Sequence, residues 1–137
     1  MNETFGSRQE AAEHLRRADS RWTEAVRTFH AYPERLRRLA EAAETQRKAF
    51  LFADLCEIKW KPRENARNLH LAPELEPPNR IGPPKLWAKF DHAQKHFGDA
   101  LAGTSLMAIA QAFGEIAEAT SEIADTVEQA DAASLTG

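Results

Sequence analysis

The sequence predicts an all-α protein, a four-helix bundle in which two helical hairpins are joined by a long proline-rich connector. Apolar residues recur every three or four positions in four separate stretches, which is the spacing of one helix face. Six of the seven prolines lie between Pro62 and Pro84, where they oppose a helix interior. A chain of 137 residues can build one buried core, so we expect a single helical domain over residues 1–137.

The first helix is expected over residues 7–31. Ser7 and Glu10 have the spacing of a capping box, whose side chains satisfy backbone N–H groups at the start of a helix. The apolar stripe that follows comprises Leu15, Ala18, Trp22, Ala25, Phe29 and Tyr32. Pro33 interrupts this helix and suits the first turn of the next one.

The second helix is expected over residues 33–59, and its last turns, from Phe50 to Ile58, are apolar on more than one face. We therefore expect these turns to be deeply buried or to contact a second surface. The connector at residues 60–83 begins with Trp60, and Trp87 follows shortly after it. Because long ordered loops tend to be functional or to pack on the domain, it either straps the bundle or offers a partner-binding surface.

The third helix is expected over residues 84–102 and the fourth over residues 104–131. Gly98 and Gly103 weaken the helix near this junction, because glycine costs about 1 kcal/mol relative to alanine in a helix interior. Thr104 or Ser105 can cap a new helix. The sequence thus predicts a turn or a sharp kink between the two helices.

The fourth helix has the clearest pattern in the chain, a coiled-coil-like repeat with alternating steps of three and four residues. The stripe comprises Leu106, Ile109, Phe113, Ile116, Thr120, Ile123, Val127 and Ala130. Three alanines spaced by seven lie beside it and leave room for another helix to pack closely. We therefore expect a dimer or a hetero-complex. The predicted partner-binding residues are Ala110, Phe113, Ala117, Ala124, Trp60 and Trp87.

Charge is distributed unevenly along the chain, although the net charge is only -3. Residues 96–137 contain seven acidic residues and neither lysine nor arginine, so the 18 basic residues all precede them. Such an asymmetry favours contact between oppositely charged faces, within one molecule or between two. The fourth helix is therefore expected to present an acidic face, and the cluster Arg35–Arg38 is one candidate to meet it.

The sequence predicts no cofactor, no metal site and no catalytic residue. His92 and His96 are the candidates for metal ligands, because histidines four apart share a helix face. A third and a fourth ligand, and the Glu-x-x-His pattern of di-iron bundles, are missing. Cys56 is the single cysteine, which excludes an intramolecular disulfide and a cysteine-based zinc cage.

Nucleic-acid binding is an alternative function, because basic residues beside an aromatic ring can contact phosphates and stack on bases. The basic residues in question are Arg16, Arg17, Arg21, Arg35, Arg37, Arg38, Lys59, Lys61, Arg63 and Arg67. The aromatic ring would be that of Trp60. The same arginines can instead pair with the acidic fourth helix, so nucleic acid is not the expected partner.

Together these patterns predict a non-enzymatic helical interaction protein, either an accessory or regulatory subunit of a larger bacterial assembly or a homo-oligomer. The alternatives are a metal-binding or enzymatic bundle that uses His92 and His96, and a nucleic-acid-binding regulator. Abundant alanine, with 12 arginines against 6 lysines, favours a GC-rich bacterial source. No apolar run approaches the ~20 residues of a membrane span and no secretory signal is visible, so we expect a cytoplasmic protein.

Overall fold

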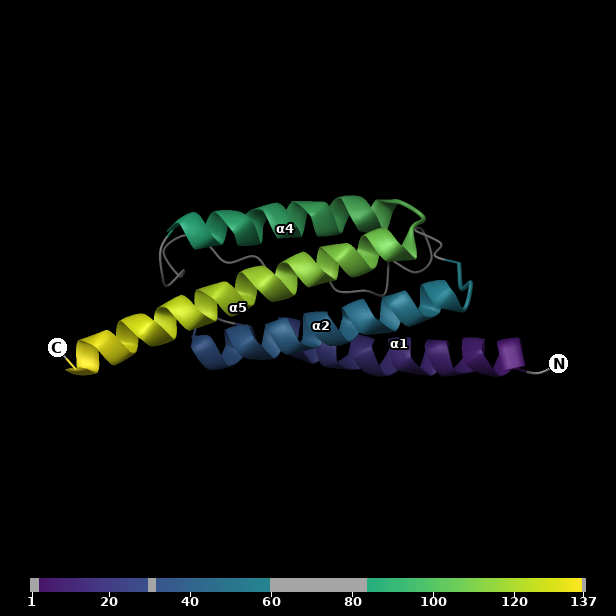
Figure 1. The fold of residues 1–137 in the computed structure, drawn as a ribbon, viewed down its shortest axis with the longest axis horizontal. Helices are drawn as coiled ribbons and strands as arrows, with labels where there is room; N and C mark the ends of the chain where they lie inside the picture. The colour runs from purple at the N-terminus through teal and green to yellow at the C-terminus, as the bar shows by residue number, and fades with distance from the viewer. Residues whose placement is uncertain (1–2, 30–31, 60–83, 137) are drawn as a thin grey trace.

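The computed structural model describes residues 3–29, 32–59 and 84–136, with side chains over residues 8–29, 32–59 and 84–130. Four helices form in this part of the chain: α1 (Glu3–Arg27), α2 (Pro33–Leu55), α4 (Pro84–Ala102) and α5 (Leu106–Thr136) (Figure 1). The described residues contain no strand. The prediction of an all-α four-helix bundle is therefore confirmed. The connector at residues 60–83, with Trp60, lies outside the described residues.

Helix α5 occupies the centre of the bundle. It packs against α2 on one side and against α4 on the other, while α1 packs against α2. Figure 1 shows the helices side by side along one long axis, with α4 and α1 at the two edges. The two hairpins that the sequence predicts, α1–α2 and α4–α5, are thus joined through the contact between α2 and α5.

The start of α2 agrees with the sequence, but the start of α1 does not. Tyr32 is extended, with φ -75° and ψ 147°, because the following proline disfavours helical backbone there, and Pro33 occupies the first turn. Helix α1 already begins at Glu3, so the predicted capping box, with Ser7 at the helix start, is wrong. The predicted end at residue 31 is also wrong, because α1 ends at Arg27.

Helix α2 ends at Leu55, four residues before the predicted end. Its end is a Schellman motif: Ile58 N–H donates to the carbonyl of Ala53, and Glu57 N–H donates to that of Asp54. Glu57 has φ 60°, the left-handed conformation that usually requires glycine. Because glutamate stands at this position, the sequence showed no stop signal there.

A turn separates α4 from α5, so of the two arrangements that the sequence predicts, a turn or a sharp kink, the structure has the turn. Helix α4 ends at Ala102, beside Gly103, and α5 begins at Leu106. The Ser105 hydroxyl accepts a hydrogen bond from the N–H of Ala108 at 3.1 Å, which is an N-cap. At the other end α5 continues to Thr136 rather than to 131, and residues 131–136 contain neither glycine nor proline to stop it.

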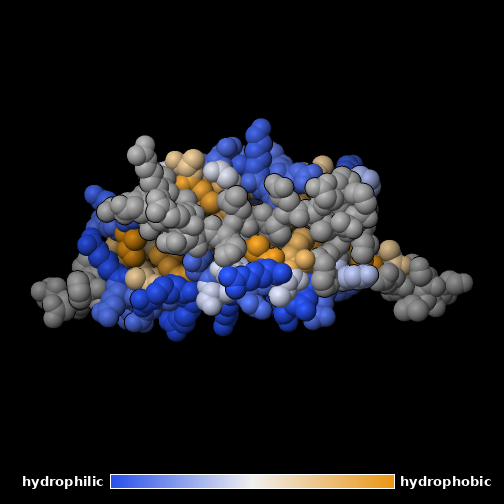
Figure 2. All heavy atoms as spheres, turned by 180° about the vertical axis from the view of Figure 1, so that it is seen from behind, coloured by the Kyte–Doolittle hydropathy of each residue, from blue (hydrophilic) through white to orange (hydrophobic). Residues whose placement is uncertain are grey.

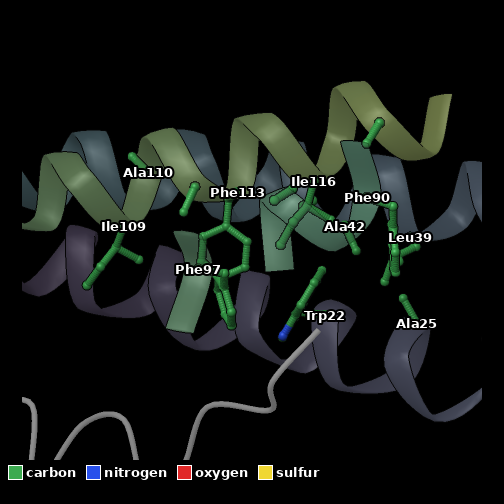
Figure 3. Close-up of a cluster of buried hydrophobic side chains, with 14 of the residues drawn as sticks. Trp22, Ala25, Leu39, Ala42, Phe90, Phe97, Ile109, Ala110, Phe113 and Ile116 are labelled. Atoms are coloured by element: carbon green, nitrogen blue, oxygen red, sulfur yellow. The ribbon is translucent and has the colours of Figure 1, made fainter. Parts of the chain in front are cut away.

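Large aromatic side chains fill the space between the two hairpins (Figure 3). The Phe113 ring lies 5.1 Å from that of Trp22 on α1, 4.8 Å from that of Phe97 on α4 and 5.6 Å from that of Phe50 on α2. One side chain of α5 therefore contacts all three other helices. None of the described helices is long and apolar enough to cross a membrane.

Candidate interaction surface

The structure places most of the predicted partner-binding residues inside the chain. Ala110, Phe113, Ala124 and Trp87 are at most 1% exposed and belong to one core. Three of them lie on the apolar face of α5 and Trp87 lies on α4, and all four face the shared core, so they do not form a surface here. Ala117 is half-buried and lies at the edge of the contact with α2.

The small residues of α5 make room for α2 rather than for another molecule. Gly114 and Ala117 line a shallow hollow with Ala40 of α2. A Cβ atom added at Gly114 would lie 3.1 Å from Cδ of Arg47, so the arginine stem packs across the glycine. The close helix approach that the alanine spacing predicted is therefore present within the chain.

The acidic residues of α5 hold it to its two neighbours. On the α2 side, Arg37 donates to Glu128 at 2.6 Å and to Asp125 at 2.8 Å. The hydrogen bond from Arg37 lowers the pKa of Glu128, and the pKa of Arg37 is raised in turn. On the α4 side, Lys89 Nζ lies 3.0 Å from Glu122 Oε2. The expectation that an arginine of the cluster Arg35–Arg38 meets the acidic helix is thus confirmed, within one molecule.

The two candidate metal ligands lie next to each other on α4. The ring centroids of His92 and His96 are 4.7 Å apart, and His96 Nδ1 lies 2.8 Å from Glu115 Oε2. His92 also lines a hollow of about 410 Å³ between α4 and α5, together with Glu115 and Glu118. In the part of the chain that the structure describes, no three His, Cys, Asp or Glu side chains converge on a metal position.

The groove between α1 and α2 is a different surface. It carries basic side chains that form no ion pair with the described residues. Its basic end, which we call the basic groove, is a hollow of about 400 Å³. The lining residues are His14, Arg17, Ala18 and Arg21 of α1, and Thr45, Lys48, Ala49 and Phe52 of α2. The basic groove therefore combines three permanent positive charges with small apolar residues and two rings.

No carboxylate of the described residues forms an ion pair with Arg17, Arg21 or Lys48. Arg17 and Arg21 lie four apart on α1, where two like charges destabilise a helix by a few tenths of a kcal/mol. By contrast, Arg47 pairs with Glu44, and this hydrogen bond lowers the pKa of Glu44. The basic groove thus carries three positive side chains, none of which is in an ion pair with a carboxylate of the described residues.

A hydrogen bond between α1 and α2 lies beneath the groove, and the groove continues beyond its basic end. Buried Gln46 of α2 donates to Asp19 of α1 at 3.1 Å, which joins the two helices. A second hollow of about 530 Å³ shares Arg21 and Thr45 with the basic groove. It is lined as well by Ser20, Glu24, Arg38, Glu41 and Ala42, so its charges are mixed.

Sequence reasoning considered Arg17 and Arg21 as phosphate contacts but did not group them with Lys48 or Phe52 of the second helix. The repeated positive charge of Arg17 and Arg21 on one face of α1 was the available signal. Their alignment with Lys48 depends on the register of α1 against α2, which no local pattern contains. On the face opposite to that of Figure 1, hydrophilic side chains line the lower edge of the molecule, along α1 (Figure 2).

No family model, curated protein or solved structure matches this chain.

Proposed function

We propose that the protein is a small, non-enzymatic helical interaction protein of the bacterial cytoplasm, which serves as an accessory or regulatory subunit of a larger assembly. The observation that supports this proposal is the basic groove. Arg17, Arg21 and Lys48 are held on a packed helix pair, exposed and without an ion pair in the described chain. Other interhelical charges, such as Arg37 and Lys89, meet acidic residues of α5.

The test is whether the protein has a stoichiometric protein partner. Affinity capture from its native cell under near-physiological salt, followed by cross-linking and light scattering of the eluted complex, gives the partner and the mass ratio. We expect one protein to be retained at a fixed ratio and to be lost from a tag-only control. Recovery of the chain without any protein at a defined ratio contradicts the proposal.

A metal-binding or enzymatic bundle is the second candidate, and the contact between His96 and Glu115 favours it. A carboxylate that hydrogen-bonds one imidazole nitrogen orients the ring so that the other nitrogen can bind a metal, as in many zinc sites. Only two histidine ligands are in place, however, so we rank this function below protein binding. Elemental analysis of the purified protein separates the two.

A nucleic-acid-binding regulator is the third candidate, because the basic groove also suits phosphate groups. Two of the arginines in α2 are already committed to pairing, Arg37 with α5 and Arg47 with Glu44. A steep loss of oligonucleotide affinity with salt would be the signature of this function.

A further inference from the structure

We propose that the basic groove binds an acidic amphipathic helix of a partner protein, whose carboxylates contact Arg17, Arg21 and Lys48 while an apolar side chain packs beside Phe52. This inference rests on the proposed function and names the chemistry of the partner. It follows from the spacing of the charges, from the apolar part of the groove and from the acidic residues beside it.

The charges have the spacing of a helix. Arg17 and Arg21 are four positions apart on α1, which corresponds to a rise of about 6 Å along the helix. Lys48 lines the same hollow from α2. Acidic side chains four apart on an approaching helix have the same rise and can therefore meet both arginines together. Arginine suits this role because its planar guanidinium binds a carboxylate through two parallel hydrogen bonds.

The apolar part of the groove favours a protein ligand. Phe52 is only half-buried, and its ring centroid lies 5.4 Å from that of His14 at one end of the groove. Ala18 and Ala49 are almost fully buried and form the floor of the groove, so Phe52 supplies its accessible apolar surface. A helix that lies in a groove with its apolar face inward and its charges at the rim is a recurring mode of peptide recognition.

The neighbouring hollow disfavours a nucleic-acid strand. Glu24 and Glu41 line it, so a continuous phosphate backbone that follows the groove would meet acidic side chains beyond Arg21. A protein helix can place acidic residues at one end and neutral or basic residues at the other. The span from residue 14 to residue 24 of α1 is about 15 Å, which matches about three turns of a bound helix.

The experiment measures binding of the full-length protein to a fluorescein-labelled 15-residue alanine-based helix with glutamates four apart and one leucine, by anisotropy. The matched peptide carries glutamine in place of each glutamate, and a single-stranded oligonucleotide of 15 nucleotides is a third probe. We expect the glutamate peptide to bind at least about tenfold more tightly than the other two probes, because only this peptide offers both carboxylates for the arginines and an apolar side chain for Phe52.

The double variant Arg17→Ala/Arg21→Ala should weaken binding of the glutamate peptide about tenfold or more, and Lys48→Ala should also weaken it. The matched control is Arg16→Ala/Arg27→Ala, which removes the same charge from α1 outside the groove and should leave binding unchanged. Thermal unfolding checks that every variant is folded. Equal binding of the glutamine peptide, tighter binding of the oligonucleotide, or equal losses in the two double variants would each overturn the inference.

The outcomes for this inference and for the proposed function can be told apart. If a native partner is captured equally by the wild type and by Arg17→Ala/Arg21→Ala, the protein binds a partner through another surface and the groove assignment is wrong. If no partner is captured, the proposed function fails, whatever the peptide shows.

Discussion

At the scale of single residues, Phe113 connects the most parts of the bundle. Its side chain is 0% exposed, and its ring contacts those of Trp22, Phe97 and Phe50, one from each of the other helices. Phe113→Ala should therefore lower the free energy of unfolding by about 3–5 kcal/mol, the range for a buried phenylalanine. Chemical denaturation monitored by circular dichroism measures this change. An unchanged midpoint would mean that the α5 face is not packed in the purified protein.

Glu57 offers the opposite kind of change, a stabilising one. Its left-handed φ of 60° costs a non-glycine residue about 1–2 kcal/mol, and its ion pair with Arg8, at 3.7 Å between exposed side chains, returns little of this. Glu57→Gly should therefore raise the melting temperature by a few degrees, corresponding to roughly 0.5–1 kcal/mol after the larger chain entropy of glycine is included. Glu57→Ala is the control and should not stabilise, since alanine keeps the backbone cost.

At the scale of helices, the ion pairs between α2 and α5 predict a dependence of stability on acid. Because Arg37 lowers the pKa of Glu128 below 4.5, the pair contributes stability above that pH and loses it as the pH falls through the lower pKa of the folded state. The wild type should therefore lose stability below about pH 4.5 more steeply than Arg37→Gln. Melting temperatures of both proteins between pH 3 and 7 measure the difference. Parallel curves would show that this contact does not affect folding.

Helix α4 presents His92 and His96 side by side, but the described chain supplies no third converging ligand. We therefore expect the purified protein to carry no stoichiometric transition metal. Elemental analysis after washing with a chelator tests this expectation. Near-unit zinc or iron that disappears in His96→Ala would contradict it and would support the metal-binding alternative.

At the scale of the whole molecule, α5 is enclosed by its own chain. The sequence predicts a dimer or a hetero-complex along the seam of Ala110, Ala117 and Ala124, whereas the structure buries Ala110 and Ala124 in the core and leaves Ala117 half-buried. We therefore expect the isolated protein to scatter light as a single chain of 15.4 kDa at micromolar concentration. The opposite result would be the mass of a dimer for the wild type and of a monomer for Ala117→Glu, with the helical signal unchanged. That result would show that the seam is an interface between two chains.

The sequence by itself determined the helices and much of what separates them. The apolar spacing, Pro33 and the junction near Ser105 act through neighbouring residues, so a local reading of the chain was sufficient. Only the tertiary structure decided which faces meet. A periodic apolar stripe shows that a helix face is buried but contains no information on whether the covering helix belongs to the same chain. Three other features also required the packed helices: the end of α2 at Glu57, the hydrogen bonds from Arg37 to α5, and the alignment of Arg17 and Arg21 with Lys48. Each depends on residues far apart in the sequence or on backbone held by distant contacts.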